Sequence, residues 1–181
     1  MSKVEKEIKL KIGSTRGILK KIEDRGFRIF KKRHFEDNFL FDFEDKKLLL
    51  KGCILRLRVI KGKGFLTYKE PSSIPSITKV RNEIETEVKD SSSIFKILEN
   101  LGLKIIFRYQ KYRRIYKKAG LTISVDETPI GNFLELEGTE EEIIEEAKGL
   151  GFSSSDFIKE SYMEIFLKEN KGNMVFKTGC Y

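Results

Sequence analysis

The sequence is poor in cysteine and histidine. Its two cysteines, Cys53 and Cys180, are too few and too unpatterned to predict a disulfide framework or a zinc site. The single histidine, His34, nearly excludes histidine-based catalytic triads and histidine-rich metal clusters. We expect His34 at the surface or at the start of a strand.

Long hydrophobic runs are also missing. No segment approaches the roughly 18–20 apolar residues that cross a bilayer. Residues 1–5 do not contain the apolar core of a signal peptide. The sequence therefore predicts a cytoplasmic protein with no membrane partner.

Charge, in contrast, is abundant. Charged residues make up 35% of the 181 residues, and the net charge is +8. This length suits one domain with a real core, which we place at residues 1–169, followed by a polar tail at 170–181. A positive balance favours anionic partners, although solubility alone could also explain it.

The first predicted strand, Val4–Leu10, alternates between charged and aliphatic residues. Side chains in a β-strand point to opposite faces with a period of two. Glu5, Glu7 and Lys9 therefore share one face, whereas Ile8 and Leu10 lie on the other. A single strand of this kind is ordinarily a solvated surface strand with cross-strand ion pairs.

The same alternation recurs along the chain, with predicted helices in between. Charged faces are predicted for segments that contain Arg56 and Arg58; Thr67 and Lys69; Arg81, Glu83, Glu85 and Glu87; Lys111 and Arg113; Asp126; Glu135 and Glu137. Helices are predicted over residues 15–25, 45–50, 90–101, 139–148 and 156–168. The basic cluster at residues 31–33 is expected to be a solvated turn.

Helices with apolar stripes can cover the aliphatic faces of these strands, so the charged faces must point toward one another or toward water. An open sheet with a wet face and a closed barrel with a polar interior both satisfy this pattern. A closed antiparallel barrel also removes exposed sheet edges. Because an interior crowded with charge costs stability, such an interior is more plausibly functional than incidental.

The inward residues fall into two chemical groups. Arginine and lysine side chains from several strands suit a chain of phosphates. Clustered carboxylates without histidine suit a hard cation, Mg²⁺ or Mn²⁺. The predicted inward bases are Lys9, Arg56, Arg58, Lys69, Lys111 and Arg113, and the acids are Glu5, Glu7, Glu83, Glu85, Asp126, Glu135 and Glu137.

The ordered set of motifs resembles the CYTH superfamily, the triphosphate tunnel metalloenzymes. The resemblance starts with the ExExK signature at Glu5, Glu7 and Lys9, and it ends at Ser161-Tyr162. Between them lie Leu55-Arg56-Leu57-Arg58, Thr67-x-Lys69, Arg81-x-Glu83-x-Glu85, Lys111-x-Arg113, Asp126 and Glu135-x-Glu137. Glu87 adds an acid to the pattern, and the tail after Asn170 lies outside it.

This resemblance implies an α+β fold, an eight-stranded antiparallel barrel with helices packed outside. It implies that the six bases bind a triphosphate and that Glu5, Glu7, Glu135 and Glu137 bind the metal. We expect catalysis to depend on Glu5, Glu7, Lys9, Glu85 and Asp126. The expected partner is a small molecule that contains a triphosphate; nucleic acid is not expected, and a homodimer stays open.

Three functions remain open on the sequence. The first is metal-dependent hydrolysis of an inorganic or organic triphosphate. The second is a class IV adenylyl cyclase, in which the ribose 3′-oxygen of ATP attacks the α-phosphorus and pyrophosphate leaves. The third is a non-enzymatic module that binds polyphosphate or RNA. The alternation argues against it, because it places the bases on the interior faces of the strands and not on the outer surface.

Overall fold

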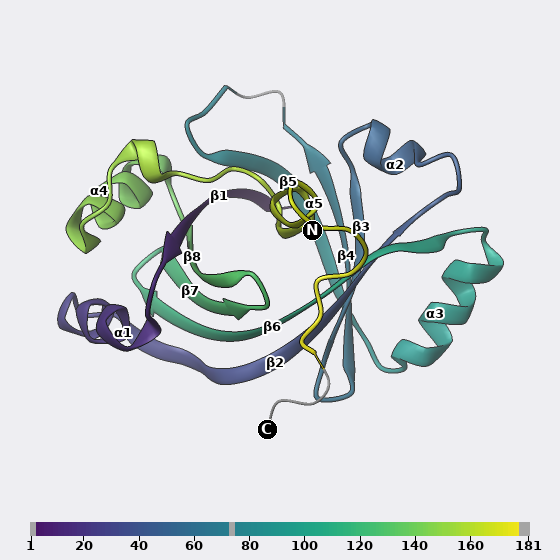
Figure 1. Cartoon of the computed structure of the whole chain (residues 1–181), viewed down its shortest axis with the longest axis horizontal. Coiled ribbons are helices and arrows are strands. Elements are labelled where there is room, and N and C mark those ends of the chain that lie inside the picture. The colour runs from purple at the N-terminus through teal and green to yellow at the C-terminus, as the bar shows by residue number, and fades with distance from the viewer. Residues whose placement is uncertain (1–2, 73–74, 178–181) are drawn as a thin grey trace.

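The computed structural model describes residues 3–72 and 75–177, and it forms a closed antiparallel barrel (Figure 1). The strand order around the barrel is β1-β5-β4-β3-β2-β6-β7-β8. The strands are β1 (Lys3–Ile12), β2 (Arg28–Asp42), β3 (Ile54–Ile60), β4 (Lys63–Pro71), β5 (Lys79–Val88), β6 (Lys104–Lys118), β7 (Leu121–Thr128) and β8 (Gly131–Glu137). The predicted fold class and strand number are confirmed.

The first strand closes the barrel, because β1 pairs with both β5 and β8. Lys3 lies opposite Glu83 on β5, and Glu7 lies opposite Glu137 on β8. Residues that lie directly opposite each other in an antiparallel pair point to the same face of the sheet. The register therefore brings the charged faces of β1, β5 and β8 to the same side, which is the interior of the barrel.

Five α-helices and one short 3₁₀ turn lie among the described residues. The helices are α1 (Thr15–Asp24), α2 (Lys47–Leu50), α3 (Ser91–Asn100), α4 (Glu140–Leu150) and α5 (Tyr162–Leu167). Polar side chains cap the longer helices at their N-termini: Ser14 caps α1, Asp90 caps α3, and Thr139 caps α4 with Glu142 in a capping box. Serine, threonine and aspartate are the residues preferred at this position.

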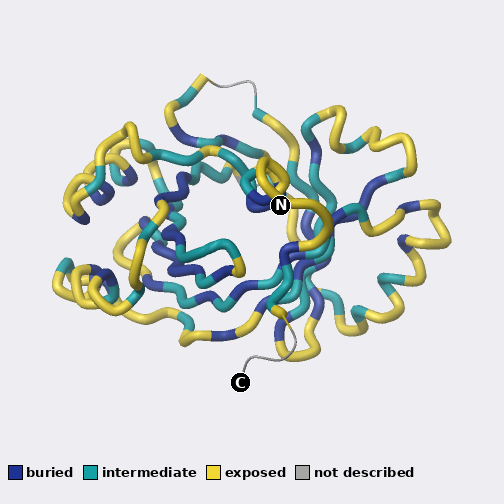
Figure 2. Tube along the Cα trace, viewed as in Figure 1, coloured by how far each residue is buried: buried dark blue, intermediate teal, exposed yellow. Residues whose placement is uncertain are grey.

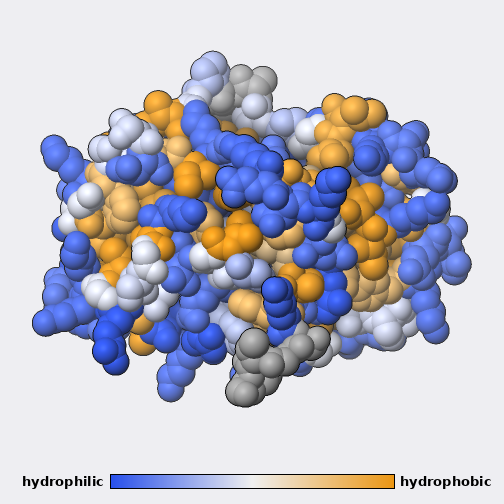
Figure 3. All heavy atoms as spheres, viewed as in Figure 1, coloured by the Kyte–Doolittle hydropathy of each residue, from blue (hydrophilic) through white to orange (hydrophobic). Residues whose placement is uncertain are grey.

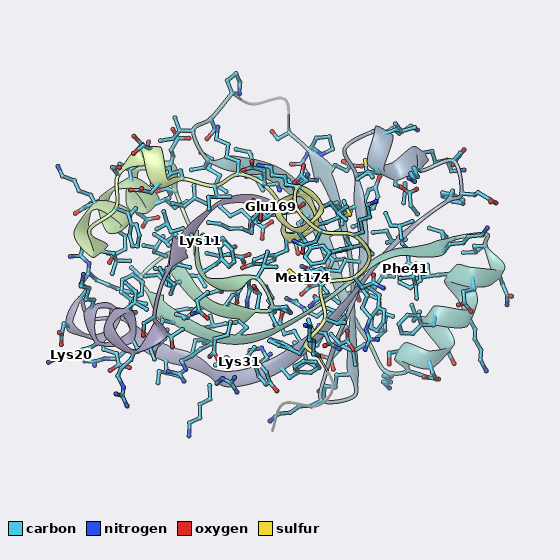
Figure 4. All side chains as sticks on the ribbon, viewed as in Figure 1. Lys11, Lys20, Lys31, Phe41, Glu169 and Met174 are labelled. Atoms are coloured by element: carbon cyan, nitrogen blue, oxygen red, sulfur yellow. The ribbon has the colours of Figure 1, made fainter. Side chains whose placement is uncertain are left out.

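Two apolar cores lie outside the barrel, between strands and helices, whereas a third includes Tyr109 and Tyr162, which line the interior cavity. Ile18 and Ile22 of α1 and Ile143 of α4 cover Ile8 and Leu10 of β1. On the opposite side Phe41 of β2 packs against Phe95 of α3 (Figures 1 and 4). Figure 2 shows buried backbone on the inner sides of α1 and α4, and Figure 3 shows apolar atoms beside these helices with hydrophilic side chains around them. The barrel interior is thus free to hold charge.

The last predicted helix is too long. Residues 157–161 are not helical, and Ile158 instead exchanges two backbone hydrogen bonds of 2.9 Å with Lys9. Helix α5 begins only after Ser161, which caps it together with Glu164. The serine and glutamate three residues apart are the sequence signal for this start.

Strand β2 includes both the basic cluster and His34, and this corrects two expectations. Residues 31–33 belong to the strand and not to a solvated turn. His34 is buried rather than exposed, and its Nε2 atom lies 3.0 Å from Glu36 Oε1. Both errors arise because β-bulges interrupt the period-two pattern in this part of β2.

The C-terminal segment contacts the barrel. Met174 is fully buried, and its backbone bonds to Arg108 O and Gln110 N on β6, at 3.0 and 2.8 Å (Figure 4). Buried Cys53 has a free thiol, whereas Cys180 lies outside the described residues. Within those residues no helix is long and apolar enough to span a membrane.

Candidate active site

The barrel encloses a cavity of about 450 Å³ with charged walls. It is lined by all six predicted bases, namely Lys9, Arg56, Arg58, Lys69, Lys111 and Arg113. The acids that line it are Glu5, Glu7, Glu83, Glu85, Glu135 and Glu137. Asp126 does not reach the cavity wall, because it is fully buried behind the bases. The structure therefore brings together every predicted site residue except Asp126.

One buried group organises the bases at the centre of β6. Asp126 of β7 accepts hydrogen bonds from Lys111 Nζ at 2.9 Å, Arg113 Nε at 2.6 Å and Tyr162 Oη at 2.7 Å. Burial opposes the charge on Arg113, but Asp126 and Glu135 outweigh it and raise the arginine pKa well above its ordinary value. Arg113 is thus held in its charged form, and Asp126 fixes the positions of both cations from behind.

A second cluster of bases lies on β3. Arg58 Nη2 donates to Glu85 Oε2 at 2.9 Å, and Arg56 Nη2 donates to Thr67 Oγ1 at 3.2 Å. Thr67 in turn donates to Glu85 Oε2 at 2.7 Å. The Nε atoms of Arg56 and Arg58 are buried without a hydrogen-bond partner among the described residues. Glu85 therefore orients the two arginines, and the Nε donor of each arginine stays unused.

The carboxylates of β1 are held by lysines of opposite charge. Lys9 Nζ lies 3.2 Å from Glu7 Oε1 and 3.4 Å from Glu135 Oε1. Burial raises the pKa of Glu7, but the combined attraction of Lys9, Lys69 and Lys79 outweighs burial and lowers the pKa to about 2. Glu5 and Glu83 share a single lysine, Lys69. For Glu5 the burial effect dominates, and its pKa is raised to about 7.

The raised pKa of Glu5 predicts a pH-dependent stability. The ordinary carboxyl pKa is 4.5, so the folded chain holds a proton that the unfolded chain releases as the pH rises from 4.5 to about 7. The free energy of unfolding should therefore fall over this window through Glu5. The glutamine of Glu5→Gln cannot ionise. Between pH 4.5 and about 7 we therefore expect the free energy of unfolding of this variant to rise by more than about 1 kcal/mol relative to that of the wild type.

Denaturant titrations of both proteins at about pH 5 and about pH 8 measure this difference. Lys69 keeps Glu83 as a partner at 2.7 Å in Glu5→Gln, so the variant does not leave the lysine alone. Glu87→Gln is the matched control, because Glu87 pairs with Lys63 at an exposed position. A constant difference between Glu5→Gln and the wild type across the two pH values would contradict the raised pKa.

Sequence reasoning missed Glu36, which lies behind two bases of the cavity, and Lys79, which lines it. Glu36 is 1% exposed, and Lys111, His34 and Arg58 surround it. Burial would raise its pKa, but Lys111 and the other cations hold that pKa far below its ordinary value. Lys79 also lines the cavity, where burial and then Lys9 lower its pKa to about 8. Glu36 lies beyond the bulges of β2, so a count of two from the start of that strand does not find it.

Tyr162 is the other functional side chain whose position only the structure reveals. It begins α5 and reaches into the barrel, where Lys9 Nζ and Lys111 Nζ lie 5.4 and 5.1 Å from its ring centroid. Burial, and then Asp126 and Glu135, raise the pKa of its phenol well above 10, so the hydroxyl remains a donor. Tyr162 therefore links α5 to the bases of the cavity.

The predicted metal ligands lie in one cavity but do not form a compact cluster among the described residues. No three acidic, imidazole or thiol groups within residues 3–72 and 75–177 converge closely enough to hold a metal ion. The donor set nonetheless fits a hard cation in kind, because Glu5, Glu7, Glu135 and Glu137 all line the cavity. Glu7 lies opposite Glu137 across the β1–β8 pair, so their carboxylates leave from neighbouring backbones.

Comparison with known proteins identifies the family. Residues 3–162 match the CYTH domain. The chain belongs to the CYTH family. A protein of Methanocaldococcus jannaschii is 34% identical over 173 residues, covering 90% of this chain and 98% of the relative. Its name, "putative adenylate cyclase", is shared by a solved structure from Vibrio parahaemolyticus.

The fold likeness extends across the CYTH barrel. The Vibrio structure has a TM-score of 0.80 at 21% identity and covers 91% of this chain and 98% of its own. A Hippeastrum protein described as having a dominant triphosphatase activity has a TM-score of 0.62 at 18% identity. It covers 93% of this chain and 96% of its own. At these identities, the two similarities show the shared fold alone.

Proposed function

We propose that this CYTH protein hydrolyses a triphosphate inside its barrel with the help of a divalent cation. The observation that supports this most directly is the convergence of nine bases, the six predicted ones among them, and six carboxylates on one cavity of about 450 Å³. A cavity of this charge needs an anion for its bases and a cation for its acids. A triphosphate with Mg²⁺ or Mn²⁺ supplies both.

The residues divide into binding and positioning groups. Arg56, Arg58, Lys69, Lys111 and Arg113 bind the phosphate oxygens, together with Lys9. Asp126 positions Lys111 and Arg113 from behind, through one hydrogen bond from Lys111 and two from Arg113. Glu85 positions the two arginines of β3 in the same way. Because these groups are fixed before the substrate arrives, they can stabilise charge that develops in the transition state.

The metal would be held by the carboxylates of β1 and β8, which are Glu5, Glu7, Glu135 and Glu137. When bound, such an ion supplies charge neutralisation on the phosphates and lowers the pKa of a bound water. A carboxylate of this set positions the water that attacks the terminal phosphorus. Lys9, which contacts Glu7 and Glu135, joins the acidic side of the cavity to the basic side.

The second candidate is an adenylyl cyclase, which the name of the Methanocaldococcus relative favours. The same bases would hold ATP, but its own ribose 3′-oxygen would replace water, and pyrophosphate would leave. One assay separates the candidates: the protein is incubated with ATP or with inorganic triphosphate, with Mg²⁺ or Mn²⁺, and phosphate, pyrophosphate and cyclic AMP are followed.

We expect phosphate from inorganic triphosphate, and loss of that activity in excess EDTA. Cyclic AMP with pyrophosphate from ATP would support the cyclase instead. Turnover that persists in EDTA would contradict the role of the metal. Binding of triphosphate with no product from either substrate would support the non-enzymatic module.

A further inference from the structure

An exposed aromatic side chain lies at one mouth of the cavity. Phe30 on β2 lines the cavity, although 64% of its surface is exposed. The other aromatic residues of the lining, Tyr109 and Tyr162, are buried. Single exposed phenylalanines are common on protein surfaces. Phe30 differs because its ring adjoins a charged cavity rather than open surface.

The backbone places the ring there through a β-bulge. Ile29 lies opposite Tyr116 and Lys31 lies opposite Ile115, so Phe30 is an extra residue without a counterpart on β6. A bulge of this kind redirects a side chain and is common beside active sites. Lys31 follows the bulge on β2, the strand along the lower side of the barrel (Figure 4). Two adjacent irregularities in one strand hold Phe30 away from the regular alternation.

Phe30 lines the same cavity as the predicted phosphate and metal groups. Lys117 Nζ is 4.0 Å from the centroid of the Phe30 ring. Lys117 lies opposite Thr122, and Thr122 lies opposite Glu137 on the next strand. Two strand spacings, about 10 Å, therefore separate the backbone of Lys117 from that of Glu137. An organic group on a triphosphate held in the cavity would reach Phe30 at this mouth.

We propose that Phe30 is a specificity-determining residue that stacks on the flat heterocycle of a nucleoside triphosphate. This rests on the proposed function, because the triphosphate must lie among the bases of the cavity. The interior offers charge, which suits phosphates, and Phe30 offers an apolar face, which suits a base. The ammonium of Lys117 favours a neutral, electron-rich ring and repels a cationic one. The preferred ligand is therefore a nucleotide rather than inorganic triphosphate.

Tryptophan is absent from the sequence, which allows a direct test. Phe30→Trp introduces a single fluorescent reporter at the mouth. In EDTA, to prevent turnover, we expect ATP to quench its emission, CTP to quench it less because of its smaller ring, and inorganic triphosphate to compete without comparable quenching. Phe35→Trp is the matched control, because Phe35 lies on the same strand and packs outward on Tyr112 at 5.3 Å.

Calorimetric binding to Phe30→Ala completes the test. Loss of base stacking typically weakens binding about tenfold or more, so we expect this loss for ATP and less than about twofold for inorganic triphosphate. Quenching by ATP no stronger in Phe30→Trp than in Phe35→Trp, or equal weakening of both ligands in Phe30→Ala, would overturn the stacking proposal alone. A wild-type protein that binds neither ligand would overturn the proposed function, and this inference with it.

Discussion

Replacing Asp126 with alanine is expected to lower the free energy of unfolding by about 3–5 kcal/mol. The carboxylate is fully buried and accepts hydrogen bonds from Lys111, Arg113 and Tyr162. Its removal leaves two buried cations without their shared partner, and burial of an uncompensated charge is costly. Denaturant titration followed by circular dichroism measures the loss.

Glu127→Ala is the control for Asp126→Ala, because Glu127 is the next residue on the same strand. Its carboxylate pairs with Arg33 at 2.9 Å, and the side chains are 33% and 42% exposed. Exposed pairs contribute about 0–1 kcal/mol, so this variant should remain close to the wild type. If Asp126→Ala does not fold, Asp126→Asn, which keeps the shape, should show a smaller loss. Equal stability of Asp126→Asn, Glu127→Ala and the wild type would contradict the role of Asp126.

Replacing Arg56 with alanine is expected to reduce kcat/KM for inorganic triphosphate by about 10- to 100-fold. Hydrogen bonds to charged groups contribute about 1.5–3 kcal/mol each, and this range corresponds to that factor. Arg56 lines the cavity and has a buried Nε atom without a partner among the described residues. Part of the loss should appear in kcat, because charge on the phosphates changes during transfer.

Arg108→Ala is the matched control for Arg56→Ala. Arg108 is also a strand arginine with a carboxylate partner, Asp37, but its side chain is 41% exposed and does not line the cavity. We expect its kcat/KM to stay within about twofold of the wild type. Arg56→Lys keeps the charge but loses the planar guanidinium group, so its kcat/KM should lie between those of Arg56→Ala and Arg108→Ala. Unchanged kinetics in Arg56→Ala would remove the main support for a phosphate-binding role.

The period-two pattern predicted most of the barrel, because the inner faces of several strands are charged and their outer faces are apolar under the helices. Ile8 and Leu10 are buried under helices, and Glu5, Glu7 and Lys9 line the cavity, as the alternation requires. An interior of mixed charge gives a strong signal in sequence, since every inward position of several strands is marked. The register of the strands and the closure of the barrel follow because the charged faces of all the strands must point to the same interior.

The pattern failed where the backbone departs from regular strand or helix. The bulges of β2 hid Phe30, His34 and Glu36, because an inserted residue reverses the parity on either side of it. The helix predicted over residues 156–168 was too long, since Ile158 uses its backbone groups to pair with Lys9. Such tertiary pairing is not encoded in local periodicity. The role of each charged side chain depends on partners from distant strands, which sequence order does not reveal.

Closure of the barrel by β1 also constrains the order of events during synthesis. This strand leaves the ribosome well before its partners Glu83 and Glu137, which lie much later in the chain. Until Glu137 has emerged, Ile8 and Leu10 lack their final cover, and one edge of β1 stays open. Pairing between such distant segments is slow, and open edges invite association with other chains. The nascent chain, rather than the finished barrel, is therefore the form of this protein most in need of a chaperone.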